Sequence, residues 1–134
     1  MPSPPHPHDE ARRQAVLARY HILDSENEQA YDDLVTIAAR ICDAPIAAIS
    51  LIDEDRQWFK SRKGVEAQQT GRDISFCDHA ILAPEETTVV RDASTDARFL
   101  DNPLVTGALG VRFYAGAPLV TCLLYTSDAA DDLL

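Results

Sequence analysis

The stretch "PIAAISLIDEDRQWFKS", Pro45 to Ser61, decides the fold class that this sequence predicts. Pro45 ends any preceding helix. The run from Ile46 to Ile52 is short, apolar and rich in β-branched residues, which is typical of a strand covered on both faces. The turn-forming residues "DEDR" follow, and "QWFKSRKG" after them predicts an antiparallel return strand. We therefore expect a β-hairpin from Ile46 to Arg62.

Two amphipathic helices are predicted before the hairpin. The first, from Asp9 to about His21, has apolar side chains at helical spacing and arginines after an acidic start. The second is expected to start at Ser25, because Ser25 and Glu28 stand three residues apart and match a capping box. Its apolar residues recur every three or four positions, which predicts one stripe that faces a core. This stripe consists of Tyr31, Leu34, Val35, Ala38 and Ile41.

The remainder of the chain predicts shorter elements. Residues 63–74 contain two glycines and mixed charges, so we expect a loop that lies over one face of the sheet. Ser75 is the expected N-cap of a short helix that ends before Pro84. Residues 87–94 and 111–120 predict two further strands, with loops and single helical turns between them. The sequence therefore predicts an α+β fold in which an antiparallel sheet is flanked by helices.

Composition predicts one globular domain in a reducing compartment. The chain has 134 residues, of which 46% are hydrophobic, and a formal net charge of −10, which disfavours binding to nucleic acid or to anionic membranes. Cys42, Cys77 and Cys122 form no C-x-x-C pair, so neither a disulfide framework nor a zinc ribbon is indicated and a cytoplasmic location is expected. No apolar run approaches the roughly 18 residues that a membrane span needs. The first eight residues, with four prolines, predict a disordered lead.

Several ordered segments resemble the GAF domain family, and the similarity extends from about Arg12 to Val120. These segments are "PIAAISLIDEDRQWFKS", "ISFCDHAI", "DASTDARFLDNPLV" and "RFYAGAPL". The chain most resembles the N-terminal sensory GAF domains of bacterial sensor histidine kinases, which belong to two-component systems, and of diguanylate cyclases. The resemblance implies helices on one face of the sheet and a ligand pocket between the other face and the loops. It also implies a sensory and regulatory role in signal transduction, with a fused output domain and without catalysis by the domain itself.

The resemblance leaves the ligand and any cofactor unknown, because relatives bind cyclic nucleotides, bilins, haem or small metabolites. Bilin-binding relatives commonly have a cysteine followed directly by a histidine, whereas Asp78 stands between Cys77 and His79 here. In a helix these two side chains diverge by about 200°, and two ligands are too few for a metal site. No catalytic or metal-ligating residue is therefore expected. Lining of a ligand pocket and plain packing of a buried thiol both remain open for Cys77.

Five residues are candidates for ligand binding, and each could instead serve packing. They are Trp58, Phe76, Cys77, His79 and Tyr114. Arg72 could bind an anionic ligand or pair with a loop carboxylate, and we favour the pairing. Asp96 and Arg98 are expected to form an ion pair that fixes a loop.

Three functions are compatible with these residues. The first is a sensory domain that binds an unidentified small molecule or relays a signal, with a homodimer through its first helix as one further partner. The second is a cysteine-dependent reductase of small sulfoxides, similar to free methionine sulfoxide reductase, for which a resolving cysteine near Cys77 is missing. The third is a structural dimerisation module. We favour the sensory domain.

The stretch "CLLYTSDAADDLL", Cys122 to Leu134, differs from what the resemblance implies. Relatives continue with a turn, a strand that completes the sheet and a final helix. The residues present here instead resemble a translated transposase adapter used in DNA library preparation. We therefore expect an incomplete domain over residues 9–121, with a C-terminal strand and helix missing, and a non-native tail over residues 122–134. Leu123 to Tyr125 are expected to occupy part of the vacant strand position.

Overall fold

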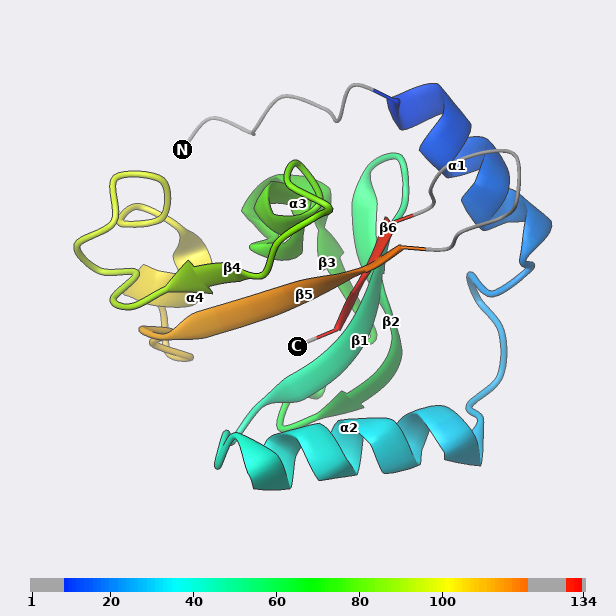
Figure 1. The fold of residues 1–134 in the computed structure, drawn as a ribbon. Helices are drawn as coiled ribbons and strands as arrows, with labels where there is room; N and C mark the ends of the chain where they lie inside the picture. The colour runs from blue at the N-terminus through cyan, green and yellow to red at the C-terminus, as the bar shows by residue number, and fades with distance from the viewer. Residues whose placement is uncertain (1–8, 121–129, 134) are drawn as a thin grey trace.

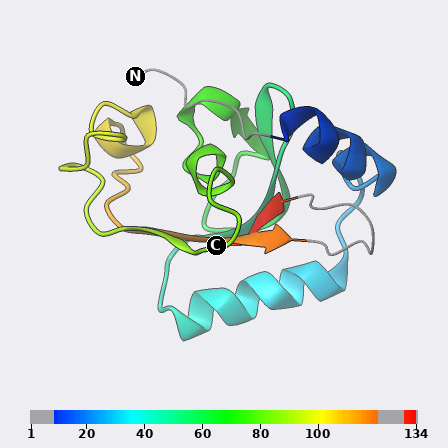
Figure 2. The ribbon, with the colours of Figure 1, turned by 45° about the horizontal axis from the view of Figure 1, so that its top comes forward.

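The structure, a computed structural model, describes residues 9–120 and 130–133. In this part of the chain one antiparallel sheet has the strand order β3-β2-β1-β6-β5-β4. The sheet lies between α2 on one side and α3 and α4 on the other, as Figures 1 and 2 show. The α+β class predicted from the sequence is confirmed. The elements are α1 (Glu10–Arg19), α2 (Gln29–Ile41), β1 (Ala47–Ile52), β2 (Arg56–Lys63), β3 (Gln69–Gly71), a 3₁₀ turn (Arg72–Ile74), α3 (Cys77–Ala80), β4 (Thr88–Val90), α4 (Pro103–Thr106), β5 (Tyr114–Val120) and β6 (Ala130–Leu133).

The predicted hairpin is present as β1 and β2, which pair in antiparallel register from Ala47 opposite Lys63 to Ile52 opposite Gln57. All six residues of β1 are buried, as expected for a strand that is covered on both faces. Gly64 follows β2 with a positive φ of 83°, and a Cβ at this position would clash with the carbonyl oxygen of Pro45. The close approach therefore requires glycine at the end of the hairpin.

The second helix begins later than predicted. It starts at Gln29, and the preceding Glu28 forms no side-chain capping hydrogen bond, so the prediction of a capping box at Ser25 was wrong. The hydroxyl of Ser25 instead donates to the carbonyl oxygen of Ile22 and accepts a hydrogen bond from the buried Lys60 ammonium at 2.8 Å. Lys60 also pairs with the carboxylate of Glu28 at 2.7 Å. Ser25 and Glu28 therefore both bind Lys60 on β2, and neither side chain caps the N-terminus of α2.

The predicted buried stripe of α2 is only partly correct. Val35 and Ala39 are the buried residues of this helix and pack against β1, with the half-buried Tyr31 beside them. Leu34 and Ile41, which we expected to face the core, are exposed. The reason is that α2 carries apolar residues on two faces, and only one of these faces contacts the sheet.

The segment predicted as a loop over residues 63–74 contains regular structure. β3 pairs with β2 in antiparallel register, with Gly71 opposite Arg56 and Gln69 opposite Trp58. The 3₁₀ turn follows at once and leads to α3. Part of the segment is thus an edge strand of the sheet, although its sequence has no strand periodicity, and residues 64–68 are irregular as predicted.

The position between β1 and β5 is occupied by β6, which belongs to the stretch that we predicted to be non-native. β6 pairs with β5 from Ala117 opposite Leu133 to Val120 opposite Ala130, and with β1 at Ile49 and Ser50. Our sequence-based prediction placed Leu123 to Tyr125 in this strand position, and these residues lie outside the described part of the chain. A short strand therefore joins the two halves of the sheet.

Candidate functional site

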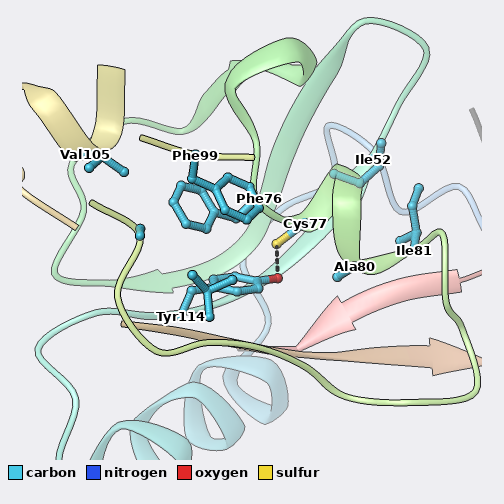
Figure 3. Close-up of a cluster of buried hydrophobic side chains, with 10 residues drawn as sticks. Ile52, Phe76, Cys77, Ala80, Ile81, Phe99, Val105 and Tyr114 are labelled. Atoms are coloured by element: carbon cyan, nitrogen blue, oxygen red, sulfur yellow. Dashed lines mark hydrogen bonds between the residues drawn. The ribbon is translucent and has the colours of Figure 1, made fainter. Parts of the chain in front are cut away.

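The residues around α3 form a buried group, called the aromatic cluster here, between the sheet and the loops on the side opposite α2. Figure 3 shows it. The rings of Phe76 and Phe99 stack with centroids 4.2 Å apart, and the ring of Tyr114 lies tilted against Phe76 at 5.2 Å. Stacked and tilted rings at these separations are favourable beyond their burial. The cluster consists of Ile52, Phe76, Cys77, Ala80, Ile81, Val90, Ala93, Phe99, Val105 and Tyr114.

The thiol of Cys77 lies among hydroxyl groups inside this cluster. The Tyr114 hydroxyl donates to Cys77 Sγ at 3.3 Å, and the Ser50 hydroxyl donates to the same sulfur at 3.1 Å (Figure 3 shows the first bond). Tyr114 reaches this position because its ring lies across Gly116, where a Cβ would clash with the tyrosine. Gly116 on β5 thus provides the space that lets the tyrosine hydroxyl reach the sulfur.

His79 borders the aromatic cluster from α3. Its ring meets Phe99 edge-on with centroids 4.6 Å apart, and its Nε2 is buried without a hydrogen-bond partner in the described part of the chain. Burial lowers the pKa of His79, and the nearby Arg98 guanidinium lowers it further, against a smaller opposing effect of Asp96. The imidazole is therefore neutral at pH 7 and presents an unused nitrogen.

The structure does not place Trp58 with the other four candidates. Trp58 is buried on β2 in a separate group with Leu17 of α1 and Leu51 of β1. Phe76, Cys77 and Tyr114 share the aromatic cluster, and His79 contacts it through Phe99. Sequence reasoning missed Phe99, which lies in an irregular segment where no periodicity marks a core position.

A buried ionic network connects α3 to the N-terminal helix. Arg72, which is 4% exposed, donates to the Asp78 carboxylate at 2.8 Å and to the Glu10 carboxylate at 2.8 Å. It also donates to the carbonyl oxygen of Asp53 in the β1–β2 turn. We expected Arg72 to pair with a loop carboxylate. The pairing is present, but the carboxylates belong to α1 and α3.

The Glu10 carboxylate also binds a second arginine in the same network. Arg13 donates to the Glu10 carboxylate at 3.0 Å and to the carbonyl oxygen of Ile52 at 2.7 Å. Burial alone would raise the pKa of Glu10, but the hydrogen bonds from Arg72 and Arg13 outweigh this effect and hold the pKa far below its ordinary value. Glu10 therefore remains ionised, and α1 is fixed to the hairpin and to α3 by charge-assisted bonds.

The loop before α4 carries the other predicted ion pair. Arg98 pairs with Asp96 at 2.8 Å, as the sequence predicted. The Asn102 side chain accepts a hydrogen bond from the Leu104 backbone at 2.8 Å and donates one to the carbonyl oxygen of Ile74 at 2.9 Å. Asn102 thereby caps α4 and ties this loop to the residues just before α3.

In residues 9–120 and 130–133 no group of three or more histidine, cysteine or acidic side chains could hold a metal ion. The cysteines of this part are Cys42, exposed at the end of α2, and Cys77, buried in the aromatic cluster. No helix of the same part has the length and hydropathy that a membrane span requires.

Comparison with known proteins identifies the domain. The family model described as "GAF domain" matches residues 26–127. A cyclic di-GMP phosphodiesterase of Pseudomonas aeruginosa is 42% identical over 121 residues, which cover 90% of this chain and 20% of that protein. The crystal structure of the GAF domain from an Acinetobacter phosphoenolpyruvate-protein phosphotransferase superimposes with a TM-score of 0.52 at 16% identity, covering 92% of this chain and 74% of that one. The family resemblance inferred from the sequence is confirmed, and the chain spans about a fifth of the length of its curated relative.

Proposed function

Because the chain belongs to the GAF domain family, we propose that it is a sensory and regulatory domain that binds a small molecule at the aromatic cluster and relays the event to an output domain. The observation that carries the proposal is the position of α3. This helix supplies Cys77 and borders the cluster with His79, whereas Asp78 between them bonds to Arg72. One short helix therefore belongs both to the candidate site and to the ionic network.

The ligand site is proposed at Phe76, Cys77, His79 and Tyr114. These residues offer aromatic faces, a thiol, a hydroxyl and a neutral imidazole whose Nε2 is buried without a partner among the described residues. Such a set suits a small, partly aromatic molecule with a few polar atoms. The ligand would replace side-chain contacts within the cluster and would offer His79 the hydrogen bond that it lacks.

The relay is proposed to run from α3 through Arg72 to α1. Asp78 and Glu10 bind the same guanidinium, so a displacement of α3 changes the hydrogen bonds that hold α1. The Arg72–Asp78 pair is buried and the Arg72–Glu10 pair is partly buried. Such a chain of discrete partners is the kind of contact through which two sites can be coupled. α1 lies at the N-terminal end of the domain and packs on the sheet through Leu17.

The output domain is proposed to act in cyclic dinucleotide signalling. The relative from Pseudomonas aeruginosa is a cyclic di-GMP phosphodiesterase, and this chain covers only a fifth of its length. The segment described here is accordingly proposed to regulate such an output domain and not to carry its activity. A kinase or cyclase output domain, as the sequence resemblance also allows, is the alternative partner.

The reductase alternative has less support. Cys42 lies at the far end of α2, and the described residues place no second cysteine beside Cys77 that could resolve an oxidised sulfur. The sulfur instead accepts hydrogen bonds from Ser50 and Tyr114. We propose that Cys77 serves ligand contact and packing, and that the domain works in the cytoplasm, where both thiols stay reduced.

The proposal is tested by the melting temperature of the purified chain in the presence of a panel of small metabolites that includes cyclic dinucleotides. A ligand at 100 times its dissociation constant adds about 2.7 kcal/mol of stability, so a clear upward shift is expected for at least one compound. His79→Ala should remove the shift, and Cys42→Ser, far from the site, should retain it. If no compound raises the melting temperature, or if the shift survives both His79→Ala and Tyr114→Phe, the proposed site is wrong.

A further inference from the structure

The Arg98 guanidinium has one end that no residue of the described part of the chain occupies. Its Nε and Nη2 donate to the two oxygens of the Asp96 carboxylate at 3.1 and 2.8 Å. These bonds use two of the five N–H groups of a guanidinium. Nη1 and the second proton of Nη2 therefore remain available among residues 9–120 and 130–133. The side chain is 48% exposed, so a molecule from solvent can reach this end.

Two contacts hold this guanidinium in place. The Asp96 carboxylate accepts a further hydrogen bond from the backbone N–H of Arg98 at 2.9 Å, which fixes the carboxylate beside the arginine. The guanidinium carbon lies 5.0 Å from the ring centroid of Phe99. A planar fork that is already fixed loses little conformational freedom when its free end binds a ligand. The free end is thus prepared to bind a carboxylate through two parallel hydrogen bonds.

His79 contacts the same phenyl ring. Its ring centroid lies 4.6 Å from that of Phe99, and its Nε2 is buried without a partner in the described part of the chain. The histidine ring and the Arg98 guanidinium therefore both lie within 5.0 Å of one ring centroid. A small molecule beside Phe99 can reach a cationic fork at its exposed end and a neutral nitrogen at its buried end.

The charges at this edge of the aromatic cluster favour an anion. Arg98 lowers the pKa of His79 more than Asp96 raises it, so the positive charge of the pair prevails at the histidine. The chain as a whole has a formal net charge of −10, which repels multivalent anions. A ligand with a single negative charge is therefore better suited than one with several.

From the free guanidinium end, the phenyl ring and the buried nitrogen, we infer that the ligand is a small hydroxy-substituted aromatic monocarboxylate. Its carboxylate binds Arg98, its ring contacts Phe99, and its hydroxyl bonds to Nε2 of His79. A hydroxyl both donates and accepts, so it fits either tautomer of the neutral imidazole. This assignment rests on the proposed ligand site and adds the ligand class and a specificity-determining residue, Arg98.

Pairs of acids and amides test the ligand class. The purified chain is titrated by isothermal calorimetry with 2-, 3- and 4-hydroxybenzoate and 4-hydroxyphenylacetate, and with the neutral amide of each, at matched ionic strength. The amide keeps the ring and the hydroxyl and loses only the charge. At least one acid is expected to bind, and its amide should bind at least about tenfold more weakly, because a charge-assisted pair is lost. Binding of no acid, or equal affinities of acid and amide, would overturn the assignment.

Substitution of Arg98 tests the residue. Arg98→Gln should weaken binding of the acid at least about tenfold and leave the affinity for the amide unchanged. Arg98→Lys, which keeps the charge without the fork, should have an intermediate effect. Arg40→Gln is the matched control, because Arg40 is an exposed arginine on α2, on the other side of the sheet. Equal weakening of acid and amide by Arg98→Gln would show an indirect effect on the loop and overturn the role of the guanidinium.

Failure of this assignment can be distinguished from failure of the proposed function. A neutral compound whose binding is lost in His79→Ala and kept in Arg98→Gln would leave the aromatic cluster as the ligand site and refute only the carboxylate. If neither the acids nor any neutral compound binds, both the ligand class and the proposed site are wrong. Far-UV circular dichroism shows that each variant is folded.

Discussion

Arg72 is the residue whose loss should damage this domain most, because it is buried and satisfies several partners at once. Its guanidinium binds the carboxylates of Glu10 and Asp78 and the carbonyl oxygen of Asp53. Arg72→Met keeps an apolar stem of similar length and removes every one of these bonds. Asp78 is 1% exposed and would then be a buried carboxylate that has lost its cationic partner at 2.8 Å.

The expected loss of unfolding free energy in Arg72→Met follows from the burial of both Arg72 and Asp78. Removal of one member of a buried ion pair costs about 3–5 kcal/mol, because the remaining charge is left in a poorly solvated place. A domain of this size has a total stability of about 5–15 kcal/mol, so the variant should retain only part of it. With a urea slope near 2 kcal/mol per molar, the unfolding midpoint should fall by roughly 2 M. Asp78→Asn in the Arg72→Met background should recover at least about 1 kcal/mol, since the buried side chain that lost the Arg72 guanidinium is then neutral.

Urea unfolding followed by tryptophan fluorescence measures these differences, and Arg98→Met is the matched control. Arg98 also pairs with one carboxylate at 2.8 Å, but its side chain is 48% exposed, so its loss should cost at most about 1 kcal/mol. If Arg72→Met and Arg98→Met lower the free energy of unfolding equally, or if Asp78→Asn brings no recovery, the reasoning about the buried network is refuted.

Three further predictions concern the site and the chain. Gly116→Ala should destabilise the domain by about 1–3 kcal/mol and raise the rate at which Cys77 reacts with a thiol reagent, because the methyl group displaces Tyr114 from the sulfur; an unchanged rate would contradict this. Because the folded-state pKa of His79 lies below its ordinary value of 6.5, the unfolded chain binds the proton more readily, so the stability that His79 contributes is present above pH 6.5 and is lost as the pH falls through that range. His79→Gln should flatten the dependence of unfolding free energy on pH between 7 and about 5.5, and an identical slope in both proteins would argue against it. We also propose that residues 122–134 are not native, and genomic DNA with an uninterrupted reading frame for "CLLYTSDAADDLL" would disprove this.

The parts of the fold that local pattern determines were predicted correctly. The hairpin of β1 and β2 follows from an apolar run, a turn and a return strand within a few residues of one another. α1 likewise follows from its spacing of apolar residues. The family assignment also succeeded, because it rested on several segments in order and not on one short motif.

The predictions that were wrong depend on contacts between residues far apart in the sequence. The start of α2 was misplaced because Lys60, far along the chain, binds Ser25 and Glu28. The orientation of α2 was ambiguous because apolar residues occupy two of its faces, and spacing alone does not say which face meets the sheet. Long-range partners of this kind leave no periodic signal in the sequence.

The candidate site was predicted in part for the same reason. Phe76, Cys77 and Tyr114 come from segments that the sequence marked, and the structure brings them together. Trp58 was included because a strand exposes alternate residues to opposite faces, and nothing in the sequence states which face holds the site. No local sequence pattern predicts that Glu10 on α1 is a partner of Arg72, and the pairing is apparent only in the structure.

The central claim, that the aromatic cluster is a sensory site coupled to α1, is tested most directly by amide chemical shifts. The ¹⁵N-labelled chain is titrated with the compound that stabilises it most, once unchanged and once as Asp78→Asn. We predict shifts at Phe76 to Ala80 and at Tyr114 in both proteins. Shifts at Glu10 to Arg13 are expected only in the unchanged chain, because the network from Asp78 to Glu10 transmits them. Shifts confined to residues outside the cluster, or equal shifts of α1 in both proteins, would contradict it.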